Sequence, residues 1–230
     1  MKFIAYGTIL LNILAYIYLF YNTRPFTLFT LTQCLILLII SEFLQSVMHE
    51  IGHLLAGKFT GYHLLFFQIG FLSIINSRKG TGLKISKRKD FNYQCVMIPQ
   101  SNTGNLLFIY NAGGILINLA INIIFIMLIQ LDIVRISIIL LPLIFAGNNK
   151  LFANAIPYVH NNLLNDMKII IILMRSPTAQ HDYFQYLSMY ENKFRGIYVG
   201  KFVPTKPDAA ERYDSFFAKA ASRLTDDGQR

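Results

Sequence analysis

The sequence predicts an α-helical integral membrane protein with about four transmembrane helices, a small strand-rich segment at the membrane surface between the second and third of them, and a cytoplasmic helical tail. The chain is too apolar for an ordinary soluble domain, because 54% of its 230 residues are hydrophobic and its mean hydropathy is +0.44. Apolar runs of bilayer-spanning length recur along it. The net charge of +9 is concentrated in residues 78–89 and in the C-terminal third, as the positive-inside rule predicts for cytoplasmic segments.

Composition also argues against several classes of protein. Basic loops beside membrane spans account for the charge, so we expect the lipid bilayer as a partner and no nucleic acid. Cys34 and Cys95 belong to no CxxC motif and indicate neither a disulfide framework nor a thiolate metal site. The N-terminal apolar run lacks the small-residue cleavage pattern of a secretory signal, so we expect a retained span.

The first two predicted spans follow one another near the N-terminus. Residues 3–20 form the first apolar run, and tyrosines near its end suit the membrane interface. The stretch 22–25, which ends in proline, breaks this helix. The second span is predicted from about 28 to 57, where Gly57 and Gly61 end it.

Residues 62–100 differ in character from the spans. Their first part is apolar but rich in aromatic and β-branched residues, and the basic stretch 77–89 is rich in turn-forming residues. This pattern predicts strands joined by turns, one of them near Tyr93–Ile98. Because non-helical backbone at membrane depth needs protein or water to satisfy its hydrogen bonds, we expect this segment at the membrane surface, with His63 at the interface.

Two further spans are predicted in the middle of the chain. The third, about 105–130, contains the small-residue patch 111–118, which allows close helix packing. The fourth, about 136–157, ends at a proline. The apolar run 169–174 is too short to span, and we interpret it as an interfacial or loosely packed helix.

The distribution of basic residues predicts how the spans are oriented and where the cytoplasmic tail begins. The basic loop after the second span should be cytoplasmic, and alternation of the spans then places the C-terminal third on the same side. We therefore expect a membrane-embedded domain over residues 1–174 and a cytoplasmic tail over 175–230. Within that tail, residues 207–224 have the pattern of an amphipathic helix.

One stretch of the second span carries residues suited to chemistry. His49-Glu50-Ile-Gly-His53 places two imidazoles four residues apart, so on a helix both lie on one face and can bind one metal ion. Glu50 lies about 100° round the helix from His49 and can reach a metal-bound water without being a ligand. Gln45 and Glu42 share the face of His49. Glu42 either serves the site through a ligand or a water path, or is an acid satisfied by a neighbouring helix.

These residue types fit a zinc hydrolase. Zinc held by two neutral imidazoles and a carboxylate keeps a fourth position for water, and lowers the pKa of that water to roughly 7. Glu50 would take the proton as a carbonyl is attacked and pass it to the leaving amine. A helix can also carry two histidines at this spacing by chance. However, ionisable residues in lipid are costly, and three of them within five positions favour a functional site.

Three patches of the chain resemble the site-2 protease family of intramembrane zinc metalloproteases. The resemblance covers about residues 28–170, with the motifs in the family's order and a strand-like segment between the first two. The three patches are HEIGH at 49–53, NAGGILIN at 111–118, and NAIP at 154–157 followed by Asp166.

The resemblance implies roles for individual residues. It implies a zinc site with three protein ligands, His49, His53 and Asp166, and with Glu50 as the general base. Asn118 and Asn154 become candidates for holding the substrate or stabilising the oxyanion. His160 is an alternative third ligand, since an imidazole binds zinc as well as a carboxylate does. We favour Asp166 because two histidines and one carboxylate match the hydrolase pattern.

The leading expectation for function is an intramembrane zinc metalloendopeptidase with Zn²⁺ as its cofactor. Its substrate would be a transmembrane or membrane-associated peptide or protein, cut near the cytoplasmic face. We expect a multi-pass protein of a bacterial plasma membrane with its active site towards the cytoplasm. The alternative is a catalytically silent zinc-binding membrane protein that binds peptides or partners, in which four protein ligands would close the site.

Overall fold

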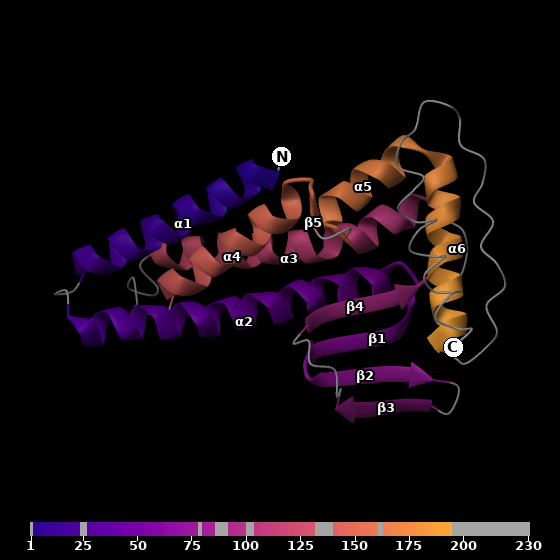
Figure 1. Cartoon of the computed structure of the whole chain (residues 1–230), viewed down its shortest axis with the longest axis horizontal. Helices are drawn as coiled ribbons and strands as arrows, with labels where there is room; N and C mark the ends of the chain where they lie inside the picture. The colour runs from indigo at the N-terminus through magenta and orange to yellow at the C-terminus, as the bar shows by residue number, and fades with distance from the viewer. Residues whose placement is uncertain are drawn as a thin grey trace. The chain divides into compact units, whose positions relative to one another are not determined.

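The computed structural model of the chain describes residues 2–23, 27–77, 80–85, 92–99, 104–131, 140–160 and 163–194. Within these ranges the protein is mostly helical and contains a small antiparallel sheet (Figure 1). The sheet lies in sequence between the second and third helices, where the strand-rich segment was predicted. The six described helices are α1 (Lys2–Thr23), α2 (Leu28–Phe59), α3 (Gly104–Gln130), α4 (Leu140–Ala155), α5 (Asp166–Arg175) and α6 (Pro177–Phe194).

The chain forms two compact units. The first lies within Met1–His53 and Ala112–Lys168, and its described part is built mainly from helices, with a short two-stranded sheet of β5 (Val159–His160) and β6 (Leu163–Leu164). The second lies within Leu54–Asn111 and Ile169–Arg230 and contains the four-stranded sheet and α6. Helices α2, α3 and α5 each contribute residues to both units.

Two helices are long and apolar enough to cross a bilayer. They are α2, with 32 residues, and the stretch Leu106–Gln130 of α3, with 25. The apolar part of α1, Phe3–Leu19, is shorter, and α4 has 16 described residues. The start of the expected fourth span falls in 132–139, outside the described ranges. Length and composition are weak evidence for membrane insertion on their own, because core helices of soluble proteins and signal sequences share them.

Helices α2 and α3 approach closely in the first unit because glycine lies at the contact. A Cβ atom added to Gly52 would lie 2.8 Å from the carbonyl carbon of Gly113, closer than real Cβ atoms come, and would also meet Ile117. Small residues at a helix interface allow such backbone contact. The close packing predicted for the patch 111–118 is therefore observed.

Helix α1 packs along α4 in the same unit (Figure 1). Tyr16 and Phe145 are buried with their ring centroids 5.4 Å apart, and the Tyr16 hydroxyl donates to the backbone oxygen of Cys34 at 3.3 Å. The amide of Asn12 donates to the backbone oxygen of Phe145 at 2.7 Å. Apolar packing and buried hydrogen bonds thus join α1, α2 and α4.

The sheet of the second unit is antiparallel throughout, in the order β3-β2-β1-β4 (Figure 1). Gly70 ends β1 at a φ of 59°, in the left-handed region that glycine adopts without strain, and the chain turns directly into β2. The strand predicted near Tyr93–Ile98 is β4. The strands are β1 (His63–Gly70), β2 (Leu72–Ser77), β3 (Gly80–Ile85) and β4 (Asn92–Ile98).

The first part of the expected tail packs in the second unit. Helix α6 contacts β4, and the imidazole Nε2 of His63 lies 2.9 Å from Glu191 Oε1 of α6. His63 was expected at the membrane interface, and in the structure its contact with Glu191 links β1 to α6. The amphipathic helix predicted at 207–224 lies outside the described residues.

The close contact between α2 and α3 predicts the effect of a methyl group at Gly52. In Gly52→Ala the new Cβ meets a backbone carbonyl that cannot rotate away, so we expect the free energy of unfolding to fall by about 1–3 kcal/mol. The measurement is the melting temperature of the purified full chain in detergent. Gly7→Ala is the matched control, because Gly7 lies in α1 with open space where its Cβ would be. A Gly52→Ala protein that melts no lower than Gly7→Ala would contradict this packing.

Candidate metal centre

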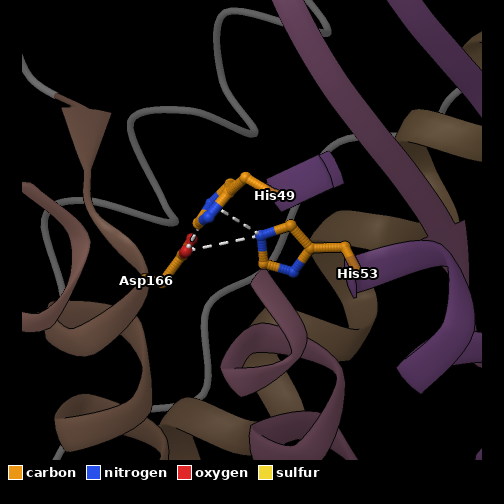
Figure 2. A group of neighbouring side chains, drawn as sticks. All are labelled: His49, His53 and Asp166. Carbon is orange, nitrogen blue, oxygen red and sulfur yellow. Dashed lines mark hydrogen bonds and ion pairs between the residues drawn. The ribbon is translucent and has the colours of Figure 1, made fainter. Parts of the chain in front are cut away.

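The two motif histidines lie one helical turn apart on α2, and Asp166 begins α5 (Figure 2). Both imidazoles are buried, with 6% of each residue exposed. Their rings meet edge to face, with centroids 4.8 Å apart and an interplanar angle of 85°. The side chains of His49, His53 and Asp166 all point to one small volume (Figure 2).

The distances between these side chains suit a tetrahedral metal ion. His49 Nε2 lies 3.2 Å from His53 Nε2, and Asp166 Oδ2 lies 3.0 Å from the first nitrogen and 3.3 Å from the second. Metal bonds of about 2.0–2.1 Å in a tetrahedron separate neighbouring ligand atoms by about 3.3 Å. The three atoms therefore match three corners of such a site.

The hydrogen bonds of the site orient the ligand atom of His49. Asn118 Oδ1 lies 2.8 Å from His49 Nδ1, while the amide nitrogen of Asn118 donates to Gln45. Nδ1 must therefore carry the hydrogen, which leaves a lone pair on His49 Nε2. Asp166 Oδ2 is buried, and it lies within 3.3 Å of the Nε2 atoms of both His49 and His53. A cation satisfies these acceptors, so the cluster fits a metal ion.

The charge state of Asp166 also suits a ligand. Burial raises the pKa of its carboxyl group, but the neighbouring imidazoles of His53 and His49 outweigh burial and hold that pKa well below its ordinary value. The carboxylate is therefore ionised at neutral pH. Ionised carboxylate is the form in which aspartate binds metals.

Gly114 of α3 leaves the space that the cluster needs. A Cβ atom at this position would lie 2.6 Å from Nε2 of both His49 and His53. Any larger residue would therefore displace the imidazoles. The sequence pattern pointed to Gly114 only as part of a helix-packing patch, and its role beside the ligands became visible through this contact.

Asn165 fixes the turn that presents Asp166, and the sequence reasoning missed it. Its amide nitrogen donates to the backbone oxygens of Ala153 and Ile156 at 2.8 and 2.7 Å. Its Oδ1 accepts from the backbone N–H of Lys168 at 3.2 Å, which makes it the N-cap of α5. An asparagine directly before an apolar helical run is a recognised N-cap signal, so this residue could have been found.

The other predicted site residues are not members of the three-residue cluster. Glu50 follows His49 in α2 and is half-buried. Asn118 is completely buried against His49, and Asn154 donates to the backbone oxygen of Lys150 at 3.1 Å within α4. Contact of these asparagines with substrate stays a prediction. His160 lies in β5 (Val159–His160), and its side chain is outside the described part of the chain, so its assignment as the alternative ligand also stays a prediction.

Glu42 has a partner on a neighbouring helix. Asn149 of α4 donates to Glu42 Oε1 at 2.7 Å, and Asn149 in turn accepts from Asn12 of α1 at 2.7 Å. Of the two interpretations of Glu42, the acid satisfied by a neighbouring helix matches these contacts. Gln45, on the same face of α2, is hydrogen-bonded to Asn118.

Comparison with known proteins gives no relative. No family model, no curated protein and no solved structure matches this chain. The class of protein is therefore defined by the fold and the site alone. It is a mostly helical protein with two candidate membrane-spanning helices, a small antiparallel sheet and a His49, His53 and Asp166 cluster that could hold a metal ion.

The contact at Gly114 predicts the loss of metal binding in Gly114→Ala. The added methyl group occupies the space beside both ligand nitrogens, so we expect the affinity for Zn²⁺ to fall by more than about tenfold. Zinc content after dialysis and competition with a chromophoric chelator measure it. Gly7→Ala, with open space at its Cβ, should bind zinc as the wild type does. Equal zinc affinity of Gly114→Ala and wild type would rule out this geometry.

The hydrogen bonds of Asn165 predict a separate effect on stability. Asn165→Ala removes the N-cap of α5 and leaves two carbonyl groups without their donor, so we expect a loss of about 0.5–2 kcal/mol from the cap alone. Thermal unfolding of the detergent-solubilised chain measures this loss. Asn165→Asp keeps the capping oxygen and should lose less. If Asn165→Ala and Asn165→Asp both unfold at the wild-type temperature, the turn does not depend on this side chain.

Proposed function

We propose that the chain is an intramembrane zinc metalloprotease that hydrolyses transmembrane or membrane-associated peptides near the cytoplasmic face. In this proposal about four helices span the plasma membrane of a bacterium, and the metal centre faces the cytoplasm. The observation that carries the proposal is the convergence of two imidazole nitrogens and one carboxylate oxygen in the helical unit, with Glu50 next to a ligand in α2. The resemblance of three motifs to the site-2 protease family supports the same function.

The outward surface of the apolar helices supports insertion in lipid. Only 17% of the most apolar window of α2, and 28% of that of Leu106–Gln130 in α3, are buried. A core helix of a soluble protein would bury most of such a window. Residues such as Ile39 of α2 and Ile124 of α3 are 68% and 53% exposed, which suits contact with lipid tails. We therefore infer a bilayer as their surroundings.

Zinc is the metal that the donor set favours. Two imidazoles and one carboxylate are the protein ligands of a catalytic zinc in several hydrolases, whereas a structural zinc takes four protein ligands. Among the described residues the cluster has three. When bound, the zinc ion would supply Lewis-acid chemistry, polarising a carbonyl group and lowering the pKa of water.

The residues of the chain would bind the metal and transfer the proton. His49, His53 and Asp166 hold the metal, and the apolar helices around them limit the access of bulk water. Glu50 accepts the proton of the attacking water on its carboxylate and returns it to the leaving amine nitrogen as the peptide C–N bond breaks. We assign no residue to the oxyanion beyond the predicted candidates Asn118 and Asn154.

A membrane substrate would have to unwind before cleavage. An intact helix keeps its carbonyl groups in hydrogen bonds, so the scissile peptide must be extended when it reacts. The strand-rich segment 62–100, whose sheet has β3 and β4 at its edges, would hold an extended segment by strand addition. This arrangement favours peptides that carry helix-breaking residues near the cytoplasmic end of their span.

Replacement of the general base tests the proposal. In cells that produce Glu50→Gln, we expect uncut membrane peptides to accumulate, because loss of a general base lowers the cleavage rate by about 10²–10⁴-fold while the three ligands remain. The measurement compares membrane peptides by mass spectrometry in cells with wild-type and variant protein, and zinc content after purification. Glu191→Gln is a control for the same substitution outside the cluster.

The outcomes separate catalysis from binding. Undiminished cleavage by Glu50→Gln would reject Glu50 as the base. If zinc is bound in equal amounts by wild type and Glu50→Gln and no peptide differs between the two cultures, the catalytically silent alternative is favoured instead.

A further inference from the structure

Asn118 of α3 is a polar side chain in a position where water does not reach it. Its exposed fraction is 0%, and its neighbours along α3, Ile117 and Leu119, are apolar. A buried amide is costly unless each of its groups is hydrogen-bonded. The partners of Asn118 therefore determine which way its amide points.

The partners give the amide of Asn118 a single orientation. Its nitrogen lies 2.8 Å from Gln45 Oε1 and 3.2 Å from the backbone oxygen of Gln45, and both of these atoms can only accept. If the amide were flipped, its oxygen would face two other oxygens. The carbonyl oxygen of Asn118 must therefore face His49 Nδ1, at 2.8 Å.

The orientation of Gln45 is fixed in the same way. Its amide nitrogen donates to the backbone oxygen of Leu143 in α4 at 2.9 Å. A flip would place Oε1 of Gln45 against that backbone oxygen. Backbone carbonyls never donate. The chain of hydrogen bonds from the backbone of α4 through Gln45 and Asn118 to His49 therefore has a single donor-to-acceptor direction.

This direction of hydrogen bonding determines which ring nitrogen of His49 carries a hydrogen. It requires a hydrogen on His49 Nδ1, so the neutral imidazole, which is the metal-binding form, has its lone pair on Nε2, the atom that faces His53 and Asp166. We infer that Asn118, oriented by Gln45, is a positioning residue that holds His49 in its metal-binding tautomer and fixes the angle of its ring. The inference rests on the proposed metal centre but not on proteolysis.

The same helix offers a matched control for this role. Asn122 lies one turn further along α3, is 3% exposed, and donates to Asn148 Oδ1 at 2.9 Å. It shares residue type, helix and burial with Asn118. A purely structural contribution of a buried asparagine should therefore affect both positions alike.

The experiment compares metal binding by the full chain in detergent. Asn118→Leu should lower the affinity for Zn²⁺ by about 10–100-fold, the usual effect of removing the partner of a ligating histidine. It should also change the visible absorption of the Co²⁺-loaded protein, because the ring is free to rotate. Asn122→Leu should leave affinity and spectrum as in the wild type, even if its melting temperature falls.

Two milder variants keep the test informative if Asn118→Leu fails to fold. Asn118→Asp keeps an accepting oxygen towards His49 but turns its second oxygen towards two oxygens of Gln45, so its affinity should lie between those of Asn118→Leu and the wild type. Gln45→Leu removes one of the two acceptors of the Asn118 amide and should have a smaller effect than Asn118→Leu. Affinity that ranks in this order, together with the altered Co²⁺ spectrum, supports the positioning role.

Several results would overturn the inference. Equal losses in Asn118→Leu and Asn122→Leu, or wild-type affinity in a folded Asn118→Leu, would show that Asn118 does not act through His49, while the metal centre itself would stand. A wild-type protein that binds no metal would instead remove the proposed function, and the inference with it. Failure of proteolysis in a zinc-loaded chain affects only the proposed function.

Discussion

The structure depends on one electrostatic constraint: three potential metal-ligand atoms meet in an apolar helical unit. His49 Nε2, His53 Nε2 and Asp166 Oδ2 lie between 3.0 and 3.3 Å from one another. With the hydrogen of a neutral His49 on Nδ1, the lone pair of its Nε2 and the carboxylate of Asp166 repel each other unless a proton or a metal cation lies between them. Burial strengthens this repulsion because the surroundings screen charge poorly. The site is therefore suited to bind a metal ion, and the surrounding residues hold its ligands in place.

Three kinds of restraint hold this arrangement. Gly114 keeps the space beside the imidazoles open, and Gly52 brings α2 close enough to α3 for that contact. Asn118 determines the tautomer of His49 from the opposite side of the ring. Asn165 holds the turn before Asp166 by capping α5 and binding the end of α4. Each restraint uses a small or amide-bearing residue.

The sequence allowed a substantial part of the fold and the site to be predicted. Local spacing was sufficient for the histidine pair, because a turn of helix brings positions 49 and 53 together. Aromatic and β-branched residues, followed by a basic and turn-rich stretch, indicated the strands. The Gln45 to Asn118 bond, the space at Gly114 and the carbonyls bound by Asn165 depend on contacts between segments distant in sequence, and no local pattern encodes them. The amphipathic helix predicted at 207–224 lies outside the described residues and stays a prediction.

The central claim is that these three side chains bind one metal ion. X-ray absorption at the zinc edge, on the full chain purified without chelator and loaded with one equivalent of Zn²⁺, tests it most directly. The account predicts a first shell of nitrogen and oxygen at about 2.0–2.2 Å with outer scattering from two imidazoles. In Asp166→Ala the shell should lose an oxygen, and in His49→Ala one imidazole. A chain that takes up no zinc, or a first shell unchanged by both substitutions, would contradict the account.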